Sequence, residues 1–254
     1  MGKFRTIYEN LIDLSEAMIS ASSEEEDLPV ANIAHPFRSY KWRTTGDSDE
    51  TATIDLAAEY NPLAVAIIDH NLTSGAVITY ESSNDADFDP LISQETLTWR
   101  AGIIFLFLAT NSARYHRINF QDSSNPDGYI EIGRVFLGDY FEPTKNFHMN
   151  YSDGGDDLSV VSAAEGGQLF GDERDERRKL GLNWTAPVWM NNDDKLDFQA
   201  FVQSVKTTRS FIIFIDHELL PGEVYYGRLA NRPTFTNKNQ LNWWETAIEF
   251  EGAL

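Results

Sequence analysis

A mainly β fold is predicted for this chain: an antiparallel, jelly-roll-like β-sandwich followed by a second β-rich, α+β domain with one clear helix. Three observations predict it. Short runs rich in β-branched and aromatic residues recur between residues 33 and 137, turn-forming clusters separate these runs, and one later segment shows apolar residues at helical spacing. The 254 residues suffice for two domains that each bury a core.

Three segments are expected along the chain. Residues 1–28 form an N-terminal lead-in segment, where apolar positions 11, 12, 14 and 18 fit either a helix or an irregular strand. Residues 29–139 form the sandwich. Residues 140–254 form the second domain, because the sequence changes after Asp139 to glycine-rich loops and a charge-dense stretch.

Strands of the sandwich are expected at residues 51–56, 64–69, 76–82, 102–108, 114–121 and 128–137. In residues 114–121, His116, Ile118 and Phe120 alternate with the polar positions 115, 117 and 119. Successive side chains of a strand point to opposite faces of its sheet. We therefore expect this strand to bury one face and to leave the other in water.

The second domain begins with loops and continues into residues 172–179, where charges of both signs alternate. This stretch is expected to be an exposed, salt-bridged strand edge or helix face, with a charged subunit contact as the alternative. A helix near 193–208 follows an N-cap at residues 191–194. An apolar strand at 211–216, a turn at Pro221 and Gly222, a return strand at 223–229 and a closing strand near 246–251 complete the domain.

Composition excludes several classes of partner. With 40 acidic and 20 basic side chains the formal net charge is -20, which repels phosphate backbones and anionic membranes. We expect no nucleic-acid partner and no membrane insertion, since the apolar run at 103–108 is far shorter than a bilayer span. The absence of cysteine excludes disulfides, thiolate nucleophiles and Cys-ligated metals, and we expect no secretory signal.

Catalytic chemistry finds little support in the sequence. None of the five histidines is paired at the i,i+4 spacing of helical zinc sites, so no metal is expected. No P-loop and no G-x-G-x-x-G motif occurs, so no nucleotide or dinucleotide cofactor is expected. Asp69-His70 and Asp216-His217 are adjacent pairs, whose side chains on a strand point to opposite faces. Two facing carboxylates could still cleave a glycan, which leaves a glycan-degrading enzyme as the third hypothesis, but we expect a chain without enzyme activity.

Aromatic residues supply the candidate sites. Trp243 and Trp244 are adjacent on a predicted strand, so one should be buried and the other exposed or at an interface; they are the candidate interface residues. Tyr60 and Trp99, on expected sandwich loops, are the candidate ligand platform for a saccharide. We expect the remaining tryptophans mostly in the core.

Several phrases carry a family resemblance. PVAN at 29–32, YKWRT at 40–44, TIDL at 53–56 and IDHNL at 68–72 resemble the opening of discoidin-like, galactose-binding-like sandwiches. Together with RYHRI at 114–118 and GYIEIGRVFLG at 128–138, they resemble tail proteins of tailed bacteriophages. The second half resembles the β-domain that distal-tail and tail-tip proteins use to assemble rings.

The resemblance implies a structural component of a phage tail tip or baseplate, made in the host bacterial cytoplasm and located in the virion. Its implied partners are copies of itself in a ring, other tail proteins (tube, hub and fibre) and a host-surface saccharide. The alternative hypothesis is a carbohydrate-binding module that recognises a cell-surface glycan. A closed ring would indicate the first function, and stabilisation of a monomer by saccharide would indicate the second.

Overall fold

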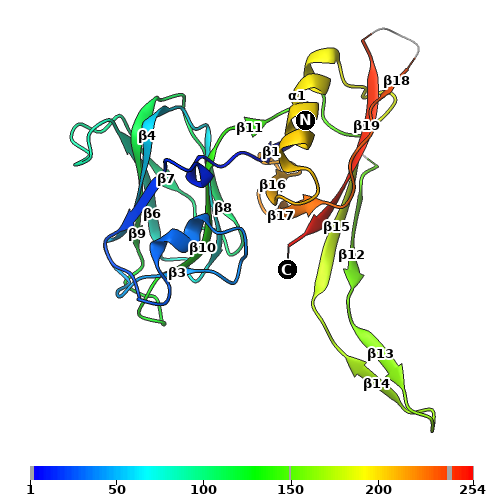
Figure 1. The fold of residues 1–254 in the computed structure, drawn as a ribbon, viewed down its shortest axis with the longest axis horizontal. Helices are drawn as coiled ribbons and strands as arrows, with labels where there is room; N and C mark the ends of the chain where they lie inside the picture. The colour runs from blue at the N-terminus through cyan, green and yellow to red at the C-terminus, as the bar shows by residue number, and fades with distance from the viewer. Residues whose placement is uncertain (1–2, 149, 239–241, 254) are drawn as a thin grey trace. The chain divides into compact units, whose positions relative to one another are not determined.

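The computed structural model describes residues 3–148, 150–238 and 242–253. The chain divides into two compact units, Ile7–Tyr140 and Met1–Thr6 with Phe141–Leu254. Within the described residues the fold is mainly β with one α-helix, which confirms the predicted class (Figure 1). No helix in this part of the chain is long and apolar enough to cross a membrane.

The first unit is a β-sandwich of two antiparallel sheets. One sheet has five strands in the order β2 (Met18–Ala21), β4 (Glu50–Tyr60), β9 (Ala113–Gln121), β6 (Val77–Ser83) and β7 (Ser93–Leu97). The other has four, in the order β3 (Trp42–Arg43), β10 (Glu131–Gly138), β5 (Ala64–His70) and β8 (Ile104–Phe107). Figure 1 shows them as the two layers of this unit.

One apolar core lies between the two sheets, with side chains from both. The expected alternation in β9 is confirmed: His116, Ile118 and Phe120 are buried. Phe120 meets Trp42 of the opposite sheet edge to face, with ring centroids 5.9 Å apart. The Trp42 ring is fully buried, and its Nε1 donates to the carbonyl of Ser23 at 3.0 Å, so the indole loses no hydrogen bond on burial.

Residues 7–28, expected to belong to a lead-in segment, lie within the sandwich unit. They include the 3-10 helix η1 (Leu11–Asp13), whose Ile12 is buried, and strand β2, which pairs antiparallel with β4. β2 is an edge strand with half-exposed and exposed side chains, so its sequence lacks the apolar alternation that marks β4 and β9. A second 3-10 helix, η2 (Val30–Ala34), precedes β3.

A buried polar pair sits in this core. Tyr80 and His116 are buried, and the Tyr80 hydroxyl donates to His116 Nδ1 across 2.7 Å. His116 Nε2 lies 3.2 Å from the Ala113 carbonyl, to which it donates in the neutral tautomer. Burial lowers the pKa of His116 to about 4, opposed by the Ala113 carbonyl, and burial raises the pKa of Tyr80. Both groups are therefore neutral at pH 7.

The second unit is built on an eight-stranded sheet. Its order is β11 (Tyr140–Phe141), β1 (Arg5–Ile7), β16 (Phe211–Phe214), β17 (Val224–Leu229), β19 (Trp244–Gly252), β15 (Glu176–Trp184) and β12 (Ser152–Asp157), and β18 (Thr236–Asn237) also pairs with β19. The expected return strand after residues 221–222 is confirmed as β17, antiparallel to β16.

Helix α1 (Asn192–Val205) confirms the predicted helix. The Asn191 side chain caps it by accepting from the backbone N–H of Asp194 at 2.8 Å, as its sequence indicates. Its buried residues include Phe198 and Phe201, and Phe201 packs edge to face on Phe211 of β16, with ring centroids 5.0 Å apart. Aromatic packing therefore joins the helix to the sheet.

The charge-dense stretch at 172–179 contains no helix: residues 173–175 link two strands, and residues 176–179 begin the second of them. It enters β15, which lies between β12 and β19. Arg178 pairs with Asp153, and Lys179 Nζ lies 2.6 Å from Asp156 on the neighbouring β12. Beyond β12 and β15, the ribbon continues into the two-stranded hairpin of β13 (Val160–Ala163) and β14 (Leu169–Asp172) (Figure 1).

Because His116 is neutral in the fold, its protonation opposes folding. An unfolded chain binds a proton near the ordinary histidine pKa of 6.5, whereas the folded chain has a His116 pKa of about 4. Between these values the unfolded state holds more protons, so the free energy of unfolding falls as pH falls. We expect this residue to account for about 3 kcal/mol of lost stability over that window.

Denaturant unfolding of the wild type and of His116→Gln, followed at several pH values from neutral to pH 4, measures this contribution. The variant should show a smaller loss of stability on acidification. Equal pH dependence in the two proteins would contradict the account.

Candidate functional site

An exposed group of aromatic side chains lies in the loop between η2 and β3. His35, Phe37 and Tyr40 belong to it, and we call residues 35–40 the aromatic loop. The rings of His35 and Tyr40 are stacked with centroids 3.8 Å apart, and Phe37 lies beside His35 at 5.2 Å. Phe37 is 66% exposed and Tyr40 47% exposed. These rings therefore present apolar area to solvent.

Backbone contacts and an ion pair hold the aromatic loop in place. The N–H of Phe37 donates to His35 Nδ1, and the N–H of Tyr40 donates to the carbonyl of Phe37 at 3.1 Å, which closes a turn. Arg38 Nε and Nη2 bind both carboxylate oxygens of Asp69 on β5. Asp69 has a backbone φ of 55°, a left-handed conformation that is sparsely populated outside glycine and concentrates at functional sites.

A second charged group lies directly after the loop. Lys41 Nζ and Arg43 Nη2 each lie 2.7 Å from a carboxylate oxygen of Glu131. Burial raises the pKa of Glu131, but hydrogen bonds from Lys41 and Arg43 outweigh burial, so its pKa lies below the usual value. Arg43 also lies over the Tyr129 ring, 4.3 Å from its centroid. The aromatic loop thus combines exposed ring faces with fixed polar groups.

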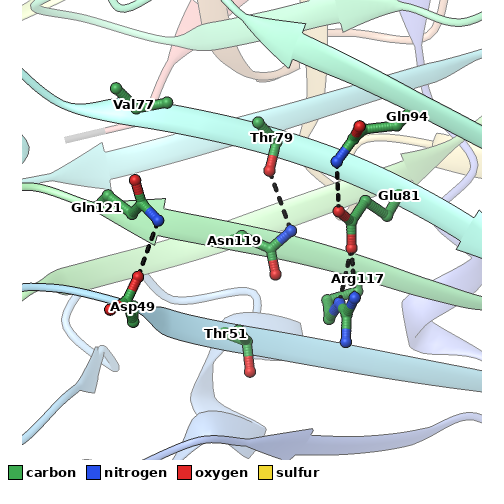
Figure 2. Close-up of a pocket in the computed structure, with 9 residues that line it drawn as sticks. All are labelled: Asp49, Thr51, Val77, Thr79, Glu81, Gln94, Arg117, Asn119 and Gln121. Carbon is green, nitrogen blue, oxygen red and sulfur yellow. Dashed lines mark hydrogen bonds and ion pairs between the residues drawn. The ribbon is translucent and has the colours of Figure 1, made fainter. Parts of the chain in front are cut away.

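The outer face of the five-stranded sheet carries a hollow, which we call the sheet groove. Its volume is about 370 Å³. Nine residues line it, as Figure 2 shows: Asp49, Thr51, Val77, Thr79, Glu81, Gln94, Arg117, Asn119 and Gln121. They come from β4, β6, β7, β9 and the residue preceding β4. The groove is therefore built from the side of the sheet opposite the core.

Strand register brings the groove side chains together in rungs. Arg117 of β9 lies opposite Glu81 of β6, and Glu81 lies opposite Gln94 of β7. Arg117 Nη2 lies 2.6 Å from Glu81 Oε2, and Gln94 Nε2 donates to Glu81 Oε1 at 2.7 Å (Figure 2). The Arg117 guanidinium also lies over the Phe88 ring at 4.1 Å. Contacts on several sides fix this rung.

Two further rungs follow along β9. Asn119 Nδ2 donates to Thr79 Oγ1 at 3.0 Å, and Gln121 Nε2 donates to Asp49 Oδ1 at 2.8 Å (Figure 2). Positions 117, 119 and 121 are two residues apart and lie on the same face of β9, so neighbouring rungs are about 7 Å apart. The groove is thus lined by a ladder of amides, hydroxyls and carboxylates along β9, whose first two rungs reach β6 and whose third reaches the residue before β4.

Glu81 is ionised within this ladder. Burial raises its pKa, but the side chains of Asn119, Arg117 and Gln94 outweigh that effect, and the pKa lies below its ordinary value. An ionised carboxylate only accepts hydrogen bonds. The groove therefore keeps a fixed acceptor beside the guanidinium of Arg117.

The candidate ligand platform named from the sequence lies elsewhere. Tyr60 ends β4 and Trp99 follows β7, and both are half-buried and pack against the core. Trp99 Nε1 donates to the carbonyl of Leu72 at 2.9 Å. The structure does not place either residue in the aromatic loop or in the groove lining. Their role as a platform stays a prediction.

The candidate interface pair has two half-buried members. Trp243 lies just before β19 and packs near Trp189, with ring centroids 6.1 Å apart. Trp244 begins β19; its Nε1 donates to Asn192 Oδ1 at 2.8 Å, and Lys195 lies over its ring. The expected contrast of one buried and one exposed ring is not observed: both residues are half-buried, and Trp243 lies outside the strand. Their interface role stays a prediction.

The two sequence-adjacent Asp-His pairs do not form acid–base dyads. Asp69 is bound by Arg38, whereas His70 Nε2 lies 2.9 Å from the carbonyl of Gly102 on the other side. Asp216 accepts from the backbone N–H of Leu219, and His217 Nδ1 contacts the carbonyl of Lys3. Over the described ranges, three or more metal-ligating side chains do not gather at any point.

Sequence reasoning missed Phe37 and Tyr40. The sequence feature that could have indicated them is HPFRSY at 35–40. This segment is rich in aromatic residues, contains a proline and lacks strand or helix periodicity. Aromatic residues in such a loop have no regular core face to occupy. The outward positions of β9 were predicted correctly, but their partners Glu81, Gln94 and Asp49 depend on strand register.

Comparisons with known proteins find structural similarity only. No family model and no curated protein matches this chain. A family 32 carbohydrate-binding module of NanJ from Clostridium perfringens, in complex with galactose, is 15% identical over 54% of this chain and 99% of its own, with a TM-score of 0.41. The lectin domain of lectinolysin, complexed with Lewis B antigen, is 14% identical over 51% and 95%, with a TM-score of 0.42. SpX-3, a fucose binding module of Streptococcus pneumoniae, is 13% identical over 51% and 96%, with a TM-score of 0.42.

Proposed function

We propose that this chain is a non-catalytic carbohydrate-binding protein that recognises a cell-surface glycan through the aromatic loop of its sandwich unit. One observation carries this proposal: Phe37 and Tyr40 expose their rings in the same loop as Arg38, whose side chain is paired with Asp69. Carbohydrate binding, which the sequence leaves open as the alternative to a phage tail role, is therefore our preferred function.

The chemistry of a saccharide suits this arrangement. A sugar ring has an apolar C–H face, which packs on an aromatic ring, and hydroxyl groups around its rim, which need donors and acceptors in fixed positions. Ligand sites commonly combine apolar and aromatic lining with a few placed polar groups. The bidentate pair of Arg38 and Asp69 supplies both kinds of polar group with its geometry already ordered.

Charge narrows the class of glycan. The chain carries a formal net charge of -20, and the cations beside the aromatic loop, Arg38, Lys41 and Arg43, are each paired with a carboxylate. Lys41 and Arg43 share the one carboxylate of Glu131, so these three cations exceed their two partner carboxylates by one charge. A polyanionic glycan would still meet the unfavourable field of the whole chain. We therefore propose a neutral saccharide as the ligand.

Tyr40→Ala tests the aromatic loop directly. The substitution removes half of the His35–Tyr40 stack without emptying a buried core position, so the fold should persist while saccharide binding weakens about tenfold or more. A glycan array identifies the saccharide, and isothermal titration calorimetry with that saccharide compares the dissociation constants.

Phe170→Ala is the matched control for this experiment, because Phe170 is a similarly exposed aromatic residue of the other unit. It should bind the saccharide as the wild type does. Wild-type affinity in Tyr40→Ala, or no saccharide bound by the wild type, would refute the aromatic loop as the site.

A second candidate function is the structural one, a ring subunit of a phage tail tip that contacts tube, hub or fibre proteins. The β13–β14 hairpin supports it. Pairing of Val161 with Gly171 and of Ala163 with Leu169 places these residues on one face of the ribbon, and that face is entirely nonpolar. Val161 and Leu169 are 68% and 69% exposed. Exposed apolar faces are typical of protein interfaces, and a lone two-stranded hairpin is marginally stable in water.

Leu169→Asp tests this second function. If the nonpolar face of the hairpin joins subunits, the wild type should be an oligomer in solution and the variant a monomer, because a carboxylate in an apolar contact is strongly unfavourable. Light scattering measures the molar mass of both proteins. Leu219→Asp, at an equally exposed leucine outside the hairpin, should leave the oligomer intact. A wild type that remains a monomer at all concentrations, or equal masses for all three proteins, would argue against the hairpin as a subunit contact.

A further inference from the structure

We infer that the sheet groove is a second saccharide site, which binds a stretch of neutral, hydroxyl-rich oligosaccharide along strand β9. This inference rests on the proposed function, because it assumes that the chain binds carbohydrate. It assigns a separate set of side chains of the sandwich unit to that task, none of them in the aromatic loop.

The side chains in the groove supply both donors and acceptors. Gln94, Asn119 and Gln121 carry amides, each with two N–H donors and one carbonyl acceptor. These amides therefore retain hydrogen-bonding capacity beyond the bonds that hold them to Glu81, Thr79 and Asp49 (Figure 2). A hydroxyl group both donates and accepts, so a chain of hydroxyls matches such a surface better than a ligand with acceptors alone.

The groove is also ordered before any ligand arrives. Glu81 is held by Arg117 and Gln94, and Arg117 is held by Glu81 and by the ring of Phe88. Side chains already fixed by their neighbours lose less conformational entropy when a ligand binds. The side chains of the ladder are therefore preorganised for binding. Independent surface residues would instead have no contacts that fix their positions.

Charge and lining decide the class of ligand. The one cation of the lining, Arg117, is neutralised by Glu81, and the remaining charge is the carboxylate of Asp49. An anionic ligand would therefore meet a net negative surface. None of the nine lining residues is aromatic, so a flat apolar ligand has no ring to stack on. A neutral saccharide satisfies both conditions.

The length of the ladder decides how much of the ligand is held. From Arg117 to Gln121 the strand advances about 14 Å, which is longer than a single sugar ring. Three rungs at a regular interval can contact successive parts of one extended chain. We therefore assign the groove to an oligosaccharide rather than to a monosaccharide.

The test uses the full chain and a panel of neutral di- to hexasaccharides of glucose, galactose, xylose and N-acetylglucosamine, with hyaluronan fragments as the charged comparison. Binding is followed by NMR at the side-chain amide signals of Gln94, Asn119 and Gln121. We expect a neutral oligosaccharide to shift these signals in the wild type and in Tyr40→Ala. The double variant Gln94→Ala with Asn119→Ala should weaken this binding about tenfold or more.

Gln168→Ala is the matched control, because Gln168 is an exposed amide residue of the other unit and lies outside the groove lining. It should bind as the wild type does. If saccharide binding is lost in Tyr40→Ala and unchanged in the double variant, the groove assignment fails while the proposed function stands. If the wild type binds nothing in the panel or on the array, both fail. Preferential binding of hyaluronan would overturn the neutral ligand class.

Discussion

The antiparallel pairing of β9 with β4 on one side and β6 on the other is the constraint on which the sandwich unit depends. It turns His116, Ile118 and Phe120 toward the core and Arg117, Asn119 and Gln121 toward the outer face. A slip of one residue would bury a guanidinium and expose a phenyl ring, which the alternation of the strand strongly disfavours. Core and groove are therefore two consequences of one register.

The same register determines which polar side chains pair on the inner face and on the outer face of the five-stranded sheet. On the inner face, Tyr80 and His116 satisfy each other at 2.7 Å and stay neutral. On the outer face, Glu81 stays charged because the side chains of Asn119, Arg117 and Gln94 lower its pKa more than burial raises it. A surface ion pair alone stabilises a fold little. The value of the outer pair lies in holding two polar groups at fixed positions on an otherwise solvated face.

Local patterns predict much of this molecule and leave out what long-range contacts decide. Helix α1 and the wet and dry faces of β9 follow from spacing within one segment. β2 was missed, because an edge strand with exposed side chains carries no apolar alternation. The position of Phe37 depends on the ion pair of Arg38 with Asp69, which is 31 residues away in the sequence. The groove depends on the register of several strands. Burial of Trp243 depends on neighbours such as Trp189 that are distant in sequence.

We propose that saccharide binding belongs to the sandwich unit. An NMR titration of the wild-type chain with the saccharide selected on the array tests it most directly, because every backbone and side-chain amide reports separately. We expect shifts concentrated at the aromatic loop and along the outward residues of β9. Shifts confined to the β13–β14 hairpin or spread over the second unit would contradict it.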